Sequence, residues 1–563
     1  MNKRVGMLAI GLACVAAVAG ADVRVFSIAD FGARPGDCLE TKHIQAAIDA
    51  ASAAGGGEVQ VPEGVFRVAG LRLKSGVTLR LADGAVLEGS RDPKDYIQPG
   101  SFRSWYNAII VAEGASNVGI VGGRYATIDG RNCFDPKGEE CYRGPHAIRF
   151  TGCTNVTFAG YSVRDSANWA HAVFHCANVT VRDLRIWGGH DGLDVHCCTN
   201  VTVANCDFHT GDDGIAGFGN VKVTVRDCLF DCSCSCVRFG GTDCLFERCR
   251  SIQPASFGHR WGLTDEEKRL GVNRGDGLRH EGPMFTYYCD YRWGEVPRPE
   301  KIVFRECRFE KPYQLFGISF NGRNQWCCNR PLASIAFENC EVLGVRKLAG
   351  IYGGAEDPIT FTMRNCRVTP AAGTETWPLV SAYNFRLLEF ENVTLEGYVK
   401  PHLERRSMDG EVKVIGGTPL EVTFRADKRD EIRSFESLAA EVQDKAMDEA
   451  AFAEWMATNA PEGEAWRKII DIWNGRLIGE EAKKAAWTFR QRYSYYFSGG
   501  RGQVRAAYAK GGYSDVPVGP FAYALSLVSP MMARVALTDF FLSGAHSPAA
   551  YAGVAAAIKR MHP

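Results

Sequence analysis

Short alternations of apolar and polar residues recur along the chain with a period near 22 residues. The motif Asn155–Phe158 returns as Asn178–Val181 and again as Asn200–Val203, at steps of 23 and 22 residues. Each copy is followed by two or three polar residues and a second short strand, and looser copies begin after residue 300. Repeated short strands without an intervening helix predict an all-β chain that folds as a right-handed parallel β-helix solenoid.

A different periodicity precedes the repeats. Between Thr41 and Ala53 the apolar residues Ile44, Ala47, Ile48 and Ala51 lie at helical spacing, which predicts an amphipathic helix with Thr41 as a possible cap. The glycines at 55–57 are expected to end it. A solenoid leaves an apolar end that must be covered, so we expect this helix to cap the N-terminal end of the stack.

The pattern changes again near Asp427. From there the chain is rich in Ala and Glu, and helical periodicity covers residues 436–458, 464–477 and 480–496. We therefore predict a β-helix domain over 22–426 and an α-helical C-terminal region over 427–563, to which the sequence assigns no role. Aromatic residues at helical spacing are more typical of a core than of sugar-stacking platforms, and this region holds four such tryptophans: Trp455, Trp466, Trp473 and Trp487.

The stretch 253–299 interrupts the repeat within the predicted β-helix domain. It carries many charged residues together with His259, Trp261 and Trp293. A long excursion of this kind is either a functional loop or a mobile surface insertion, and the sequence leaves both open.

The N-terminus has the pattern of a secretory signal. Lys3 and Arg4 precede the apolar stretch 7–18, and small residues at 19–21 form a cleavage site, so residues 1–21 are predicted to direct export to the periplasm or the medium. Lipid anchoring through Cys14 is the alternative, which the glycine at position 11 disfavours. No later apolar run is long enough to span a membrane, so no integral membrane span is expected.

Composition narrows the function. Lys and Arg together number 65, as do Asp and Glu, and zero net charge argues against a nucleic-acid partner. Many of the 21 cysteines recur at the repeat period, for example Cys206, Cys228 and Cys249, which favours stacked core thiols over disulfides. The cluster 232–236 alternates Cys and Ser; its three cysteines could share one strand face, but without histidine partners a metal site is not expected.

Two acidic clusters stand one repeat apart. Asp191 lies in Gly-His-Asp-Gly, and Asp212 with Asp213 lies in Gly-Asp-Asp-Gly, at offsets of 21 and 22 residues. Residues one period apart become neighbours on adjacent coils, about 4.8 Å apart along the stack. Clustered carboxylates disfavour one another's ionisation, so the arrangement reduces stability, and acid–base catalysis is a common reason to keep it.

These motifs resemble those of the polygalacturonases, the family 28 glycoside hydrolases. The resemblance covers roughly residues 23–400 and includes Asp30-Phe31-Gly32-Ala33, Ile128-Asp129-Gly130 and Ser166-Ala167-Asn168-Trp169 in the family's order. The acidic clusters match the family's Asn-Thr-Asp-Gly and Gly-Asp-Asp-Cys at the same offset. The resemblance implies that Asp212 protonates the glycosidic oxygen, while Asp191 and Asp213 activate water with inversion at the anomeric carbon.

The chain also departs from the family pattern. Gly189 replaces an asparagine, Gly214 replaces a cysteine, and Ser235 stands where the family has the histidine of Gly-His-Gly. The Arg-Ile-Lys clamp for the galacturonate carboxylate has no convincing counterpart. The family's substrate contacts are thus absent or rebuilt, and five residues are candidates for replacing them, although an ordinary structural role is open for each: His190, His209, Arg238, Arg279 and His280.

Three functions remain open from the sequence. The first is an inverting glycoside hydrolase acting on a pectin-like or other plant or algal polysaccharide, which would need no cofactor or metal. The second is a non-catalytic carbohydrate-binding β-helix that kept the aspartates for polar contacts. The third is a polysaccharide lyase, in which aspartates one coil apart would bind Ca²⁺. In each case the expected partner is a poly- or oligosaccharide, and the chain is expected to be a monomer.

Overall fold

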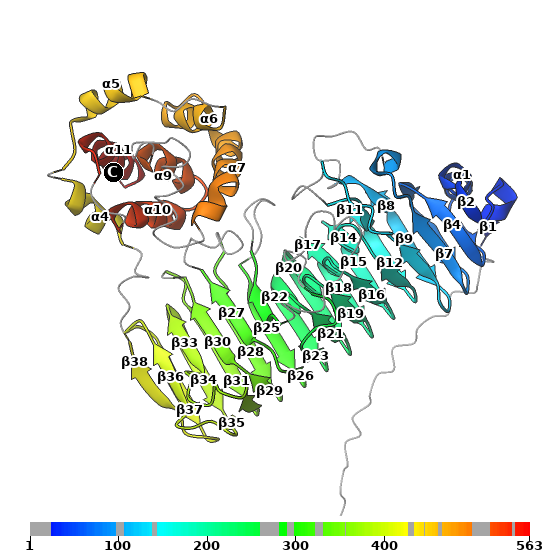
Figure 1. Cartoon of the computed structure of the whole chain (residues 1–563), viewed down its shortest axis with the longest axis horizontal. Coiled ribbons are helices and arrows are strands. Elements are labelled where there is room, and N and C mark those ends of the chain that lie inside the picture. Colours follow the sequence, from blue (N-terminus) through cyan, green and yellow to red (C-terminus); the bar gives the residue numbers. More distant parts are fainter. Residues whose placement is uncertain are drawn as a thin grey trace, which may run out of the picture.

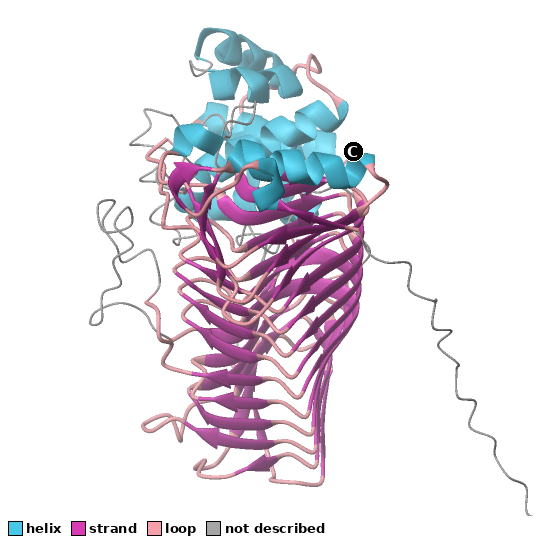
Figure 2. Cartoon of the chain, turned by 90° about the vertical axis from the view of Figure 1, so that its right-hand side faces the viewer, coloured by secondary structure: helices cyan, strands magenta, loops and turns pink. Residues whose placement is uncertain are grey.

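The computed structural model describes residues 24–96, 106–137, 143–258, 281–289, 298–320, 330–354, 356–425, 433–443, 445–459, 464–497, 518–542 and 546–562. Its strands pair only in parallel and stack into a right-handed parallel β-helix, as the sequence predicts (Figures 1 and 2). Each coil contributes to three strand ladders. Among the described residues, no helix is both long and apolar enough to cross a membrane.

The first ladder carries the candidate site. Its members are β5 (Leu71–Leu73), β8 (Ala108–Glu113), β11 (His146–Thr151), β14 (His171–Phe174), β17 (Leu193–His196), β20 (Ile215–Arg226), β22 (Val237–Glu247), β24 (Pro283–Tyr287), β27 (Gln314–Ser319), β30 (Lys347–Tyr352), β33 (Val380–Tyr383), β36 (His402–Arg405) and β38 (Glu421–Phe424). Strand β24 lies inside the stretch 253–299, so that stretch is not one continuous excursion from the repeat.

The second ladder follows the first along each coil and shares the long strands β20 and β22 with it. Its other members are β1 (Val25–Ser27), β3 (Gly57–Val61), β6 (Val77–Leu81), β9 (Ser116–Gly122), β12 (Thr154–Ala159), β15 (Ala177–Arg182), β18 (Thr199–Ala204), β25 (Glu300–Arg305), β28 (Ser334–Glu338), β31 (Ile359–Arg364), β34 (Phe385–Glu391) and β37 (Glu411–Ile415).

The third ladder is a separate sheet. It consists of β2 (Gly36–Leu39), β4 (Gly64–Val68), β7 (Ala85–Gly89), β10 (Thr127–Asp129), β13 (Ser162–Arg164), β16 (Arg185–Gly188), β19 (Asp207–Thr210), β21 (Leu229–Cys232), β23 (Arg250–Ile252), β26 (Arg308–Glu310), β29 (Glu341–Val345), β32 (Arg367–Pro370) and β35 (Thr394–Leu395).

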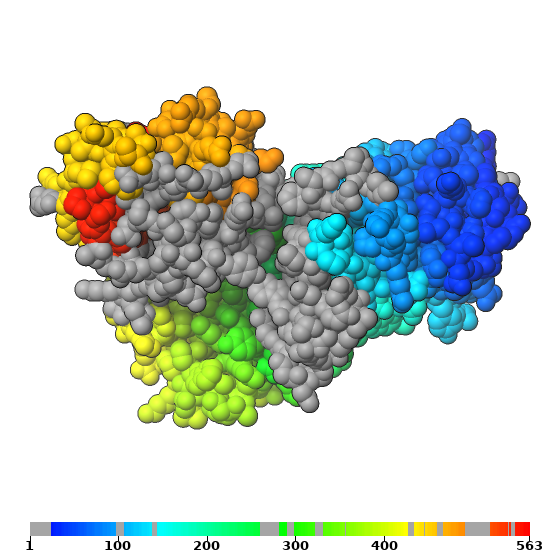
Figure 3. All heavy atoms as spheres, turned by 45° about the horizontal axis from the view of Figure 1, so that its top comes forward, coloured from blue at the N-terminus to red at the C-terminus, as the bar shows by residue number. Residues whose placement is uncertain are grey.

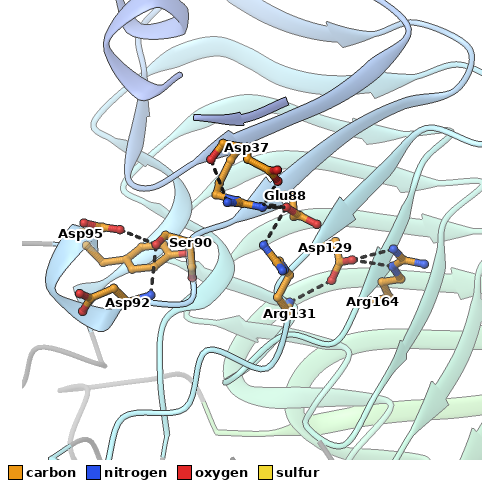
Figure 4. Close-up of polar contacts among 10 residues, drawn as sticks. Asp37, Glu88, Ser90, Asp92, Asp95, Asp129, Arg131 and Arg164 are labelled. Carbon is orange, nitrogen blue, oxygen red and sulfur yellow. Dashed lines mark hydrogen bonds and ion pairs between the residues drawn. The ribbon is translucent and has the colours of Figure 1, made fainter. Parts of the chain in front are cut away.

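Ion pairs between coils line the outer side of the third ladder near its N-terminal end (Figure 4). Arg67 and Arg131 both contact Glu88, with shortest N–O distances of 3.0 and 2.8 Å, and Arg164 contacts Asp129 at 2.7 Å. Side chains directly opposite on paired strands meet in this way because parallel strands keep their register from coil to coil. The cluster is therefore a structural charge ladder.

A change of backbone direction at the second residue of β12, β15 and β18 explains the repeated asparagine. Asn155, Asn178 and Asn200 all have positive φ, between 54° and 57°, a conformation that asparagine tolerates better than most residues. Their side chains also form a ladder: Asn178 donates to Asn155 at 2.9 Å, and Asn200 donates to Asn178 at 2.8 Å. The repeat therefore encodes a backbone turn and an amide ladder together.

The interior of the solenoid is a single apolar core to which stacked thiols contribute. The described cysteines are free, and most are buried. One column runs through six successive coils, longer than the three members expected from the sequence: Cys206, Cys228, Cys249, Cys307, Cys340 and Cys366. The thiol hydrogens bond to backbone carbonyls, as where Cys307 donates to Arg305 at 3.2 Å.

Helix α1 (Thr41–Ala53) matches the predicted range, and its apolar face (Ile44, Ala47, Ile48 and Ala51) is fully buried in the solenoid core. The cap prediction is wrong. Thr41 is the first helical residue, and its hydroxyl accepts a hydrogen bond from the Ala69 backbone N–H at 3.0 Å. The threonine is thus used to fasten the helix to the coil below it.

The C-terminal helices have their own cores. They are α4 (Phe435–Val442), α5 (Glu449–Asn459), α6 (Glu464–Trp473), α7 (Gly479–Phe497), α9 (Val518–Ser526), α10 (Pro530–Leu542) and α11 (Pro548–Met561). The single helix expected over 436–458 is two helices, α4 and α5. Trp466, Trp473 and Trp487 are buried, so they are core residues. Figure 3 shows these helices and the N-terminal coils at opposite ends of the molecule.

Candidate active site

The register of the first ladder brings the two acidic clusters together. Asp191 lies in the turn before β17, and Asp212 and Asp213 lie in the turn before β20. Because Leu193 pairs with Ile215, these turns occupy the same place on successive coils. The Asp213 backbone N–H donates to Asp191 Oδ1 at 2.9 Å. All three aspartates are at most 6% exposed, so the structure gathers them into one largely desolvated cluster.

The turn on the next coil completes one side of this cluster. The Ser235 backbone N–H donates to Asp213 Oδ1 at 2.8 Å, and the Ser235 hydroxyl donates to Thr286 at 3.0 Å. Cys234 faces the aspartates, whereas Cys232 and Cys236 belong to the apolar core. The expectation that these three cysteines could share one face is wrong, because residues 233–236 form a turn and not a strand.

Two arginines compensate the negative charge. Arg238 Nε lies 2.9 Å from Asp213 Oδ2, and Arg143 Nη2 lies 3.9 Å from Asp212 Oδ2. Arg143 also donates to Asn168 Oδ1 at 2.8 Å, which fixes its side chain over the cluster. Buried carboxylates are tolerated only when such partners are close.

A metal at this position competes with one of those arginines. Single ligand atoms of Asp212, Asp213 and Cys234 lie within 4.8 Å of one another, a spacing that could hold a cation. However, the Arg238 guanidinium contacts both Asp213 and Cys234, the latter at 3.3 Å. A guanidinium in that place supplies the positive charge itself, so these residues do not fit a metal ion well.

A fourth carboxylate, Asp194, lies on β17 beside the cluster. It is fully buried, and its Oδ1 is 3.5 Å from His196 Nε2. Burial, followed by the nearby charges of Asp191 and Asp213, raises the pKa of Asp194 well above its ordinary value. Burial also raises the pKa of Asp213, although Arg238 opposes that effect. Burial therefore favours the protonated form of both carboxyl groups.

The candidate substrate contacts have different positions. Arg238 lies in the cluster. His190 is buried with its ring edge-on to Phe134, at a centroid distance of 6.0 Å. His209 lies on the third ladder, where it contacts Asp231 at 2.7 Å and stacks on Trp187, so it has a structural role there. Arg279 and His280 lie outside the described residues.

Sequence reasoning missed several residues that the fold brings to this site. Asp194 had a usable signal, because it lies three residues after Asp191 and faces outward in the alternation of β17. Arg143 had none, since it reaches the aspartates from another coil. Cys234 belonged to the cysteine cluster noted in the sequence, but nothing in that cluster indicated a place beside the aspartates. Asn168 belongs to the family-like motif 166–169, but nothing in that motif indicates that its side chain would bind Arg143.

Comparison with known proteins agrees with this geometry. Residues 52–232 match the model of the glycosyl hydrolases family 28. The matched segment contains all three clustered aspartates. The chain is thus polygalacturonase-like. It is also 45% identical over 74 residues to an exo-poly-α-D-galacturonosidase of Dickeya chrysanthemi, a match that spans 13% of this chain and 12% of that protein.

Solved structures with the same fold are more distant. An exopolygalacturonase of Thermotoga maritima is 18% identical, with 66% of this chain and 90% of that chain covered and a TM-score of 0.43. PfbA, a surface adhesin of Streptococcus pneumoniae, is 15% identical, with 72% and 90% covered and a TM-score of 0.45. Likeness at this level carries no inference about function. The resemblance to family 28 therefore depends on the segment 52–232, and the arginine at 238 lies beyond it.

Proposed function

We propose that this chain is an inverting glycoside hydrolase that cleaves a uronate-containing polysaccharide. Asp212 donates a proton to the leaving glycosidic oxygen. Asp191 and Asp213 orient a water molecule and remove its proton as it attacks the anomeric carbon. An inverting site separates acid and base so that a water fits between them. No step requires a cofactor.

The observation that carries the proposal is the register between β17 and β20. It brings carboxylates from two turns into one desolvated cluster in which Asp213 N–H bonds to Asp191. In a cluster of this kind a proton is held by one carboxyl group and withheld from its neighbours, which is the basis of acid–base catalysis.

The substrate we propose is an anionic sugar, because two guanidinium groups lie beside the cluster. Arg238 and Arg143 approach it from coils on opposite sides; Arg143 is buried, and the Arg238 side chain is 22% exposed. A sugar carboxylate entering between them would form charge-assisted hydrogen bonds. We propose that these arginines replace the carboxylate clamp that the family carries elsewhere. The match to an exo-poly-α-D-galacturonosidase makes α-linked galacturonate the first substrate to test.

A specific observation favours the carbohydrate-binding alternative. Both oxygens of Asp213 are engaged, Oδ1 by the Ser235 backbone and Oδ2 by Arg238. These contacts occupy both carboxylate oxygens, so neither is left to accept a proton from an attacking water. A protein that retained the cluster for polar contacts to sugars would show the same geometry.

The test is a screen of polygalacturonate and other polysaccharides in which new reducing ends are counted. We expect hydrolysis by the wild type and a loss of at least about 100-fold in Asp212→Asn, since the amide is unable to donate the required proton. The matched control is Asp207→Asn, a half-exposed aspartate on β19 that pairs with Arg185 at 3.6 Å. Equal activity in both variants would refute the assigned roles. Binding without hydrolysis would favour the carbohydrate-binding alternative.

We further propose that residues 22–426 form the catalytic domain and that residues 1–21 direct the chain to the periplasm or the medium. A polysaccharide too large to enter a cell would be met there. The signal lies outside the described residues, so its support is the sequence pattern. N-terminal sequencing of the exported protein would test it, with cleavage after Ala21 as the expected result.

A further inference from the structure

A second basic site lies on the first ladder, on the C-terminal side of the aspartate cluster. The register runs from Arg238 to Thr286, then Gly317, then Gly350. Three steps at about 4.8 Å each place Gly350 about 14 Å from Arg238 along the stack. These residues occupy equivalent positions on the outer side of the sheet. The two places thus lie on the same face of the first ladder.

The floor of this site is formed by two adjacent glycines. Gly317 and Gly350 pair across β27 and β30, so no side chain rises from either position. The Gln314 amide lies over both glycines, and Lys347 reaches Gly350 beside it: a Cβ atom on Gly350 would lie 2.7 Å from Gln314 Nε2 and 3.5 Å from Lys347 Nζ. The lysine therefore holds its ammonium group close to the backbone of the sheet.

Lys347 has no counter-ion among the described residues that contact it. Burial and, after it, the charge of Arg406 lower its pKa, and the charge of Glu404 only partly opposes them. Glu404 is already engaged by two arginines, Arg406 at 2.9 Å and Arg425 at 3.5 Å. A half-buried ammonium beside a second cation is unfavourable unless an anion comes to it.

A stacked aromatic pair lies beside this charge. Tyr352 and Tyr383 follow Gly350 and Ser381 by two residues on β30 and β33, so they share the outer side of the sheet. Their ring centroids are 4.9 Å apart, and both rings are half-buried. Arg406 also hydrogen-bonds Tyr383. Tyrosine offers an apolar ring face together with a polar hydroxyl, and a sugar residue has matching apolar and polar surfaces.

We propose that Lys347, Arg406 and the Tyr352–Tyr383 pair form a distal subsite for an anionic sugar of the same polysaccharide chain whose scissile bond lies at the aspartates. An extended glycan repeats at nearly the spacing of one coil, so the subsite would take a residue several units away from the cleaved bond. This inference rests on the proposed function for the identity of the sugar. Its consequence is that long chains bind more tightly than short ones.

The test measures binding by calorimetry in the Asp212→Asn background, which prevents turnover. We expect Lys347→Met to weaken a long oligogalacturonate about tenfold, the usual effect of losing one charge-assisted contact, and to leave a galacturonate trimer unchanged. Lys347→Arg should restore most of the loss. The matched control is Lys413→Met, an exposed lysine on β37 that pairs with Glu411 at 3.2 Å.

The outcomes separate this inference from the proposed function. Equal binding of the long oligomer by Lys347→Met and the control would overturn the subsite, even if the wild type hydrolyses galacturonan. An equal loss for trimer and long oligomer would also overturn it, since that pattern indicates a site at the scissile bond. If no hydrolysis is found but length-dependent binding requires Lys347, the subsite stands and the hydrolase proposal fails. A long oligomer whose carboxyl groups have been reduced to alcohols should bind equally well to Lys347→Met and to the control Lys413→Met. That result would confirm that Lys347 recognises the charge of the sugar.

Discussion

At the scale of single residues, the site is dominated by the mutual influence of four carboxyl groups and two guanidinium groups. The aspartates at 191, 212 and 213 could be predicted from the sequence because their spacing equals the repeat period. The fourth carboxylate, Asp194, and the arginine at 143 could not be assigned in the same way. Asp194 lies outside the repeated motifs, although its place three residues after Asp191 is a signal, and the contact of Arg143 depends on the register of the whole stack.

Asp194 should make the stability of the protein depend on pH. Its pKa is raised well above the ordinary value of 3.8, so the folded chain retains a proton that the unfolded chain loses as pH rises. Wild-type stability should therefore decrease as pH rises above about 4, and this contribution should be absent in Asp194→Asn. The two melting temperatures should be similar at acidic pH, with the variant higher at neutral pH. A variant that is less stable than the wild type at neutral pH would contradict this assignment.

Arg238 should be needed for stability chiefly because it neutralises the buried negative charge of Asp213. Its replacement by glutamine leaves a buried carboxylate without its partner, which should lower the free energy of unfolding by about 3 kcal/mol. The double variant Arg238→Gln/Asp213→Asn should recover most of this stability and none of the activity. Denaturant unfolding and a hydrolysis assay measure the two effects separately. Full additivity of the two stability changes would show that the residues act independently.

At the scale of elements, the sequence predicts the strand positions well because two structural requirements select the same repeated asparagine. The repeated asparagine both adopts positive φ and joins an amide ladder, so its spacing reports the coil directly. The helix at residues 41–53 is predicted equally well, because its buried apolar residues recur at helical spacing. The cap prediction at Thr41 is wrong because its hydroxyl binds the backbone of another coil, and the prediction for the cysteine cluster is wrong because residues 233–236 form a turn.

The asparagine ladder gives a prediction about stability. Asn178→Ala removes two ladder hydrogen bonds and places a Cβ-bearing residue without a polar side chain at φ 55°, so it should destabilise the fold by about 1–2 kcal/mol. Asn178→Gly removes the same bonds but tolerates the turn, so its loss should be smaller. The melting temperatures of the two variants separate the loss of the ladder hydrogen bonds from the cost of the positive φ. A glycine variant that is less stable than the alanine variant would show that the turn conformation contributes little.

At the scale of the whole molecule, a change in composition near Asp427 separates two kinds of structure. The last described strand ends at Phe424 and the first described helix of the C-terminal region begins at Phe435, and that region has hydrophobic cores of its own. The sequence could indicate this division because a period of 22 gives way to helical spacing. It could not indicate which surface of the solenoid is charged, since the basic site at Lys347 is assembled from three coils whose residues are 59 positions apart in the chain (347 to 406).

The most direct test of the account is the configuration of the first product released from an α-linked galacturonan. Proton NMR of an early reaction of the wild type resolves the anomeric signals before they equilibrate. An inverting site requires that the β-anomer forms first. An α-anomer formed first would contradict the assigned roles of Asp191, Asp212 and Asp213, and an unsaturated product absorbing in the ultraviolet would show a lyase instead.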